Sequence, residues 1–167
     1  PQTRVEPKGE PGVSQQVHAK LAGTWTVEKT FSLPNRPATK TVGEAVQTMT
    51  HGGRFLQCEV TFDGPAGKTT GTGVIGFDPA TGRFTRVWYD SRQTKMSFRQ
   101  SKSTFDGAKI VLEAVDVDGP PARQSRTETT LSADGGRIVH RQFNPGTDGS
   151  EHLLMELVLT RKPATRR

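Results

Sequence analysis

The chain has one cysteine, Cys58, among its 167 residues. A single cysteine cannot form an intrachain disulfide, and it cannot supply the ligand set of a zinc finger. The four histidines are scattered, and none stands near another histidine or Cys58 at the short spacing of a metal-binding motif. The sequence therefore predicts neither a disulfide framework nor a metal site.

Long hydrophobic runs are also absent. No segment approaches the roughly 18 consecutive apolar residues of a membrane-spanning helix. Hydrophobic residues make up only 31% of the chain and the mean hydropathy is -0.61, which is low for a helical bundle but suits a sheet with one polar face. Eight phenylalanines and two tryptophans supply bulky core material. The length fits one domain with a real core.

Acidic residues are missing from the C-terminal segment 161–167, which contains four cations. Removing these four charges from the net charge of +6 leaves +2 for the rest of the chain. Elsewhere Lys and Arg alternate with acidic residues and Thr, as on a solvated face, and no basic stripe is interleaved with aromatic side chains. We therefore expect no nucleic-acid partner.

Turn signals are abundant. Asp-Gly, Asp-Pro-Ala-Thr-Gly and Pro-Gly-Thr-Asp-Gly segments separate short runs in which apolar and polar residues alternate. Asp and Gly favour tight hairpin turns, and such spacing is typical of an antiparallel meander. The predicted strands are 24–31, 39–50, 54–62, 68–77, 83–91, 94–103, 109–117, 123–132, 137–143 and 151–161.

These patterns predict an all-β protein, a single antiparallel up-and-down barrel of about ten strands, because closure removes exposed strand edges. A short helix, 14–22, precedes the first strand, with Ser14 as its cap and Gly23 at its end. Proline-rich connections follow the first and the seventh strands, at 33–37 and 117–122. A barrel of this size has room for a small ligand.

The expected organisation is a flexible segment at 1–13, a barrel domain at 14–163 and a basic tail at 164–167. The first residues are rich in Pro, Gly and charge, like the stub that remains after signal cleavage. We therefore expect an exported protein, periplasmic or extracellular, whose leader is absent; a cytoplasmic protein is the alternative. A monomer is expected, with a dimer as the alternative.

Several segments carry a resemblance to a known family. They are Leu21-Ala22-Gly23-Thr24-Trp25, Gly52-Gly53-Arg54-Phe55-Leu56 with Glu59, Gly71 to Asp78, Trp88-Tyr89-Asp90-Ser91, Pro145 to Gly149 with Glu151, and Met155-Glu156 before Thr160-Arg161-Lys162. In this order and spacing the chain resembles the bacterial domain-of-unknown-function family DUF1579, a group of lipocalin-like (calycin) β-barrels. The resemblance implies that the helix plugs one end of the barrel and that Trp25 packs over its floor. It implies no established activity.

Glu156 is the most unusual candidate, because it interrupts a final strand that is apolar on both faces. A buried carboxylate is costly unless it is paired or hydrogen-bonded. One interpretation is a structural pair with an arginine, most naturally Arg126, or an edge position facing water. The other is an acid that lines a ligand cavity. Glu59 and Arg126 are further ligand-binding candidates, whose side chains could equally face solvent.

Strand 83–91 places Arg86, Trp88 and Asp90 on one face, an arrangement suited to a pocket for an anion or an aromatic ligand, or to an exposed strand with a cation–π contact. His140 alternates with Ile138 and Gln142, so it could face inward, and it is a candidate general base or a wall residue. These interpretations make Trp88, Asp90 and His140 candidate ligand-binding residues.

No cofactor is expected. The letters of Gly71 to Gly76 match a dinucleotide-binding motif, but no helix follows them, so the glycines suit strand curvature or close packing instead. His152 distantly resembles the haem-ligating histidine of nitrobindin-type barrels, but its distance from the basic end of the strand is too long.

The functional hypothesis is a barrel that binds a small apolar or amphipathic molecule in its interior. Two alternatives stay open. One is an enzyme that uses the same cavity with Glu156, Glu59 or His140 as acid or base. The other is a filled structural barrel that acts through its surface.

Overall fold

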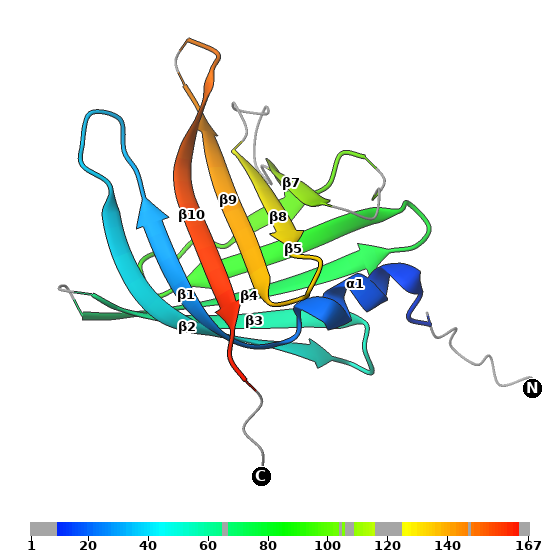
Figure 1. The fold of residues 1–167 in the computed structure, drawn as a ribbon. Helices are drawn as coiled ribbons and strands as arrows, with labels where there is room; N and C mark the ends of the chain where they lie inside the picture. The colour runs from blue at the N-terminus through cyan, green and yellow to red at the C-terminus, as the bar shows by residue number, and fades with distance from the viewer. Residues whose placement is uncertain are drawn as a thin grey trace, which may run out of the picture.

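The computed structural model describes residues 10–64, 67–103, 105, 109–115, 125–146 and 148–163. These residues form one short helix and ten antiparallel strands that close into a barrel (Figure 1). In chain order the elements are α1 (Val13–Leu21), β1 (Gly23–Phe31), β2 (Thr39–Thr50), β3 (Phe55–Gly64), β4 (Gly67–Asp78), β5 (Arg83–Asp90), β6 (Ser97–Gln100), β7 (Lys109–Val115), β8 (Arg126–Leu131), β9 (Arg137–Pro145) and β10 (Glu151–Arg161).

Consecutive strands are neighbours throughout, and the circle closes where β1 pairs with β10. Trp25 lies opposite Arg161 in this closing pair, and Phe31 lies opposite Met155. The predicted up-and-down barrel is thus confirmed, and closure leaves no strand without a partner on either side. One irregularity occurs between Leu153 and Met155, where β10 shifts its register against β9.

Helix α1 lies at one end of the barrel (Figure 1). The sequence pattern placed Ser14 at its cap, but Gly12 holds that position, and the Gly12 N–H donates to Gln15 Oε1 at 2.7 Å. Leu21 belongs to the core, and Trp25 is fully buried beneath the helix, where its indole N–H donates to the Leu21 carbonyl at 3.1 Å. The expected plug and floor are therefore present.

One basic side chain, that of Arg161, joins the end of the helix to the last strand. The Arg161 guanidinium lies over the Trp25 ring, 4.1 Å from its centroid. It also donates to the carbonyls of Lys20 and Ala22 at 2.7 Å each and to that of Gly135 at 2.8 Å. The bonds to Lys20 and Ala22 satisfy carbonyls at the end of the helix, which have no partner within it.

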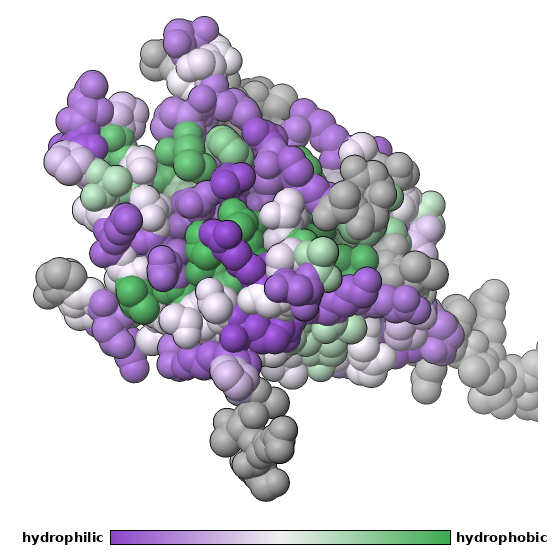
Figure 2. Space-filling model, in the orientation of Figure 1, coloured by the Kyte–Doolittle hydropathy of each residue, from purple (hydrophilic) through white to green (hydrophobic). Residues whose placement is uncertain are grey.

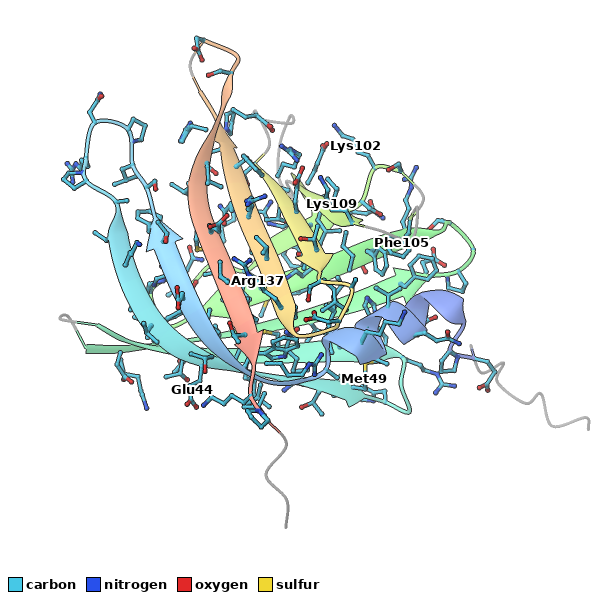
Figure 3. All side chains as sticks on the ribbon, in the orientation of Figure 1. Glu44, Met49, Lys102, Phe105, Lys109 and Arg137 are labelled. Carbon is cyan, nitrogen blue, oxygen red and sulfur yellow. The ribbon has the colours of Figure 1, made fainter. Side chains whose placement is uncertain are left out.

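A cluster of aromatic rings packs next to α1. Phe84 is buried there, and its ring packs edge-on against Phe77 and Phe105 at centroid distances of 4.8 and 5.0 Å. Met49 and Phe105, both labelled in Figure 3, pack against this cluster. His18 of α1 is also fully buried against Phe84, with 5.1 Å between the ring centroids.

On the face of the molecule seen in Figure 2, polar side chains predominate and apolar side chains lie between them. In the part of the chain that the structure describes, no helix has the length and apolar character needed to cross a membrane.

The main difference from the predicted strands is β6. The pattern predicted a strand over 94–103, but only Ser97–Gln100 pairs with its neighbours. The predicted flexible segment 1–13 lies largely outside the described residues, as do the loop at 117–122 and the tail at 164–167.

Candidate functional site

The barrel encloses a cavity of about 340 Å³ to which every strand contributes. Its wall is mainly apolar, because alternate residues of each strand point inward. The apolar lining includes Leu21, Val27, Phe31, Leu56, Val60, Phe62, Ile75, Trp88, Ile110, Leu112, Ile138, Met155, Leu157 and Leu159.

Strand β5 carries the polar part of this wall. Arg86, Trp88 and Asp90 line the cavity in sequence, and they follow Phe84, which packs under α1. Arg86 therefore lies deepest of the three, and Asp90 lies toward the end of the barrel away from the helix. The shared face predicted for these residues from their alternation is the inner face.

The Trp88 ring packs against two glycines of β4, Gly71 and Gly73. Trp88 pairs across the strands with Gly73, and a Cβ on Gly71 would stand 2.3 Å from its Cζ2 atom. A Cβ on Gly73 would stand 2.9 Å from its Cε3 atom. Both distances are too short for a real contact, so the bare backbone of β4 makes the room for the indole, in agreement with the predicted close packing.

Asp90 is held at the mouth of the cavity by its neighbours. The Trp88 indole N–H donates to Asp90 Oδ2 at 3.0 Å, and Arg92 Nη2 donates to the same oxygen at 2.8 Å. The hydrogen bonds from Arg92 are the largest influence that lowers the pKa of Asp90 to about 2. Asp90 is therefore a carboxylate at neutral pH, and its charge is already paired.

Two arginines face each other deeper in the cavity. Arg86 of β5 and Arg99 of β6 are direct cross-strand partners, and both line the cavity. Arg99 donates through Nη1 to the Ser125 carbonyl and through Nη2 to Ser125 Oγ, each at 2.9 Å. Burial, and secondarily the charge of Arg86, lowers the pKa of Arg99 to about 10. Both side chains remain cations at neutral pH.

In the described part of the chain, the Arg86 guanidinium has fewer interaction partners than that of Arg99. It lies 5.1 Å from the centroid of the Trp88 ring, a cation–π contact. Among the described residues, no carboxylate and no hydrogen-bond acceptor pairs with it. Burial lowers its pKa from the ordinary value. An arginine in this state is an unused donor group that faces the cavity.

His140 completes the polar wall from β9. It is buried, and its Nδ1 lies 2.8 Å from the hydroxyl of Thr129, its cross-strand partner. Burial is the main influence that lowers the pKa of His140 to about 3, and the charges of Arg86 and Arg99 lower it further. The imidazole is therefore neutral at physiological pH, and it shares its surroundings with both guanidinium groups.

The three other candidates lie outside the cavity. Glu59 is exposed on the outer face of β3, where Gln57 Nε2 donates to its Oε1 at 3.2 Å. Since Leu56, Cys58 and Val60 line the cavity, the apolar face of this strand points inward and Glu59 points away.

The predicted pair of Glu156 with Arg126 is wrong. Glu156 accepts from Arg141 Nε at 2.7 Å, across β9 and β10 on the outer face. Arg126 instead bonds Glu151, with Nη2 and Oε2 at 2.8 Å, as well as Glu128. The apolar residues on both sides of Glu156 misled the prediction: the inward ones line the cavity, and the outward ones are only partly covered.

Sequence reasoning missed Arg99. The segment Ser97-Phe98-Arg99-Gln100 suggests that apolar Phe98 points inward, but Phe98 is 38% exposed and Arg99 only 9%. The pairing of Arg99 with Arg86 would have revealed this orientation, but the register of so short a strand leaves no signal in the sequence.

Within the described residues, no three His, Cys, Asp or Glu side chains come together in a group that could hold a metal ion. In the part of the chain that the structure describes, the charged residues that line the cavity are four cations, Lys29, Arg86, Arg92 and Arg99, and one carboxylate, Asp90. The arrangement is therefore suited to binding through apolar contact and cationic hydrogen-bond donors.

Comparison with known proteins places the chain in a family. Residues 10–161 match the family described as "Protein of unknown function (DUF1579)". No curated protein matches the sequence. The fold is similar to that of the crystal structure of Rv2717c from M. tuberculosis, with a TM-score of 0.66, 16% identity, and coverage of 92% of this chain and 100% of that one. At this identity the similarity concerns the fold alone. Because the family match spans well over half of its length, the chain belongs to the DUF1579 family.

Proposed function

We propose that this protein binds a small amphipathic molecule inside its barrel. The observation that carries the proposal is the cavity of about 340 Å³, with its apolar wall and the few polar groups that converge on one region. Ligand pockets are typically about 300–1,000 Å³, mainly apolar, with a small number of placed polar groups. Burial of apolar ligand surface would drive binding at roughly 25 cal/mol per Å².

Trp88 gives the ligand a large flat contact surface. Its ring forms part of the cavity wall, and its position is fixed by the glycines behind it and by the bond to Asp90. A contact surface that is already ordered loses little conformational entropy when a ligand binds. This supports a binding cavity over the alternative of a filled barrel that acts only through its surface.

The enzyme alternative has less support from the geometry. Of its three proposed acid or base residues, Glu59 and Glu156 lie on the outer face, and His140 alone lines the cavity. A pKa of about 3 makes His140 a weak base at neutral pH, far from the range in which general bases work best.

The test uses an uncharged fluorescent probe, N-phenyl-1-naphthylamine, whose emission rises in apolar surroundings. We expect saturable binding with one site per chain. Leu157→Phe adds volume to the cavity wall and takes space that the probe would occupy, so it should weaken binding about tenfold, which is about 1.4 kcal/mol. Val158→Phe is the matched control, since it is the next residue on β10 and points outward.

The proposal fails if neither this probe nor an amphipathic alkyl ligand binds, or if the two variants weaken binding equally. Intrinsic fluorescence offers a second readout, because the chain has only Trp25 and Trp88. A ligand in the cavity should change the emission of the wild type and leave that of Trp88→Phe unchanged, since Trp25 does not line the cavity.

A further inference from the structure

We infer that the ligand carries an oxyanion head group, a carboxylate or a sulfate or phosphate ester, which binds between Arg86 and Arg99. This inference rests on the function proposed above, since it specifies the ligand of the same cavity. Its starting point is the direct cross-strand pairing of the two arginines, both of which point inward.

Such a pairing is unfavourable by itself. Like charges directly opposite each other on one sheet face repel, and a guanidinium held away from bulk water without an ionic partner loses much of its solvation. The lowered pKa values of both groups have burial as their main cause, and for Arg99 the charge of Arg86 adds to it. An anion placed between the two side chains would remove the repulsion and supply the missing partner.

The carboxylates of the described residues are not placed to do this. Among the described residues, Asp90 is the single carboxylate that lines the cavity, and it is engaged by Arg92 and Trp88. On the outer face of the neighbouring strands, Glu113 bonds Lys102, and Glu128 bonds Lys109 and Arg126. Lys29 adds a further cation to the cavity wall. The described part of the cavity wall therefore carries a net positive charge, with an unsatisfied donor at its centre.

The donors are also oriented. Ser125 fixes the Arg99 guanidinium with two bonds of 2.9 Å, and the Trp88 ring supports that of Arg86. A guanidinium has five N–H groups in a planar fork, so Arg99 keeps donors beyond those used by Ser125. Planar forks of this kind match the two oxygens of a carboxylate or the oxygens of a phosphate or sulfate ester.

The remainder of the ligand has an apolar path. Between the arginines and the end of the barrel away from α1, the wall includes the apolar side chains of Trp88, Phe62, Phe31 and Met155. Polar residues line the same region, among them Lys29 and the Asp90–Arg92 pair at the mouth. An anion with an apolar tail can therefore place its head at mid-depth and its tail along this path. His140 is neutral, so it adds no charge to the site, and Thr129 holds its ring in place.

The experiment compares three molecules that share one alkyl chain and differ in the head group: decanoate, decyl sulfate and decan-1-ol. Their affinities are measured by titration calorimetry with the full chain. We expect at least one anion to bind about tenfold or more tightly than the alcohol, as charge-assisted hydrogen bonds require. The anion that binds better distinguishes a carboxylate site from an ester site.

Arg86→Met removes the unpaired charge and keeps the length of the side chain. It should abolish the preference for the anion and leave binding of the alcohol unchanged or stronger. Arg83→Met is the control, since Arg83 is an exposed residue on the same strand, and the preference should survive. Without ligand, Arg86→Met should unfold at the same or a higher temperature than the wild type, because an unpaired charge has left the interior.

The inference is overturned if the alcohol binds the wild type as tightly as both anions, or if Arg86→Met keeps the anion preference. The comparison on the wild type needs no variant, so the inference can be tested even if Arg86→Met does not fold. If neither the anions, the alcohol nor the uncharged probe binds, the proposed function itself fails. Binding of the probe and the alcohol without anion preference would leave the function standing and remove only this inference.

Discussion

The indole of Trp88 occupies the space that a side chain on its cross-strand partner Gly73 would fill. Gly71 contributes in the same way, and together the two glycines allow the largest side chain of the cavity wall to lie close to β4. The shape of the cavity therefore depends on two residues that have no side chain.

Gly71→Ala should force the Trp88 ring out of its place, because the new Cβ would stand 2.3 Å from Trp88 Cζ2. Overpacking of this kind costs about 1–3 kcal/mol, measured by chemical denaturation, and the emission of Trp88 should shift. Gly76→Ala on the same strand is the control, since its Cβ would meet the exposed ring of Phe55, which can move aside. Equal losses in the two variants would contradict the packing role of Gly71.

Arg161→Met should loosen helix α1 while the barrel persists. The guanidinium joins the carbonyls of Lys20, Ala22 and Gly135 and covers the Trp25 ring. Hydrogen bonds to charged groups contribute about 1.5–3 kcal/mol each, so the loss of three of them should lower the stability by at least this amount. Amide hydrogen exchange should rise in residues 13–22 more than elsewhere. Lys162→Met, which removes a surface pair with Glu44, should leave that exchange unchanged.

The protein should lose stability as the pH falls below about 6.5. His18 is fully buried, and neither ring nitrogen has a hydrogen-bond partner among the described residues. Burial lowers the pKa of His18 from 6.5 to about 4, so in this interval the unfolded chain takes up a proton that the folded chain does not. Above pH 6.5 the titration of His18 therefore costs no stability. Near pH 4 it lowers the free energy of unfolding by about 3 kcal/mol.

His18→Phe removes this titration and should flatten the fall between pH 6.5 and 4, measured by urea denaturation across the pH range. His140, whose pKa is lowered to about 3, contributes a fall of the same sign that the variant retains. His51→Gln at an exposed turn is the control and should follow the wild type. A pH profile that His18→Phe leaves unchanged would show that His18 does not cause the loss.

Glu156→Gln should have little effect. The pair with Arg141 lies on the outer face, with both side chains partly in solvent, and such pairs contribute about 0–1 kcal/mol. Probe binding in the cavity should be unchanged. A large loss of binding in this variant would contradict the outward position of Glu156 and restore it as a cavity residue.

The barrel could be predicted because its signals are local. Hairpin turns, alternation and short connections together specify an up-and-down meander, and ten strands with the predicted centres are present. The helix and the buried Trp25 also followed from adjacent residues. The boundaries of β6 could not be predicted, because its four residues are positioned by β5 and β7 rather than by their own pattern.

The site was predictable only in part. Trp88, Asp90 and His140 were found because each alternates with its neighbours on a well-defined strand, and the structure places all three in the cavity wall. Glu59, Arg126 and Glu156 were chosen because they are charged residues within predicted strands. A charge alone does not reveal which face of a strand points inward. Arg99 escaped because its position depends on a partner 13 residues away, a relationship that lies in the register.

Because β6 is short, we expect the barrel wall to open locally at this strand before it opens elsewhere. Only a few backbone hydrogen bonds join Ser97–Gln100 to its two neighbours, whereas β9 and β10 are paired over nearly their full lengths. The free energy of local unfolding should therefore be lowest where β6 pairs with β5 and β7. Arg99 lies on β6, and Arg86 lies on the neighbouring strand β5. An anion bound by both side chains would therefore also stabilise the pairing of these two strands.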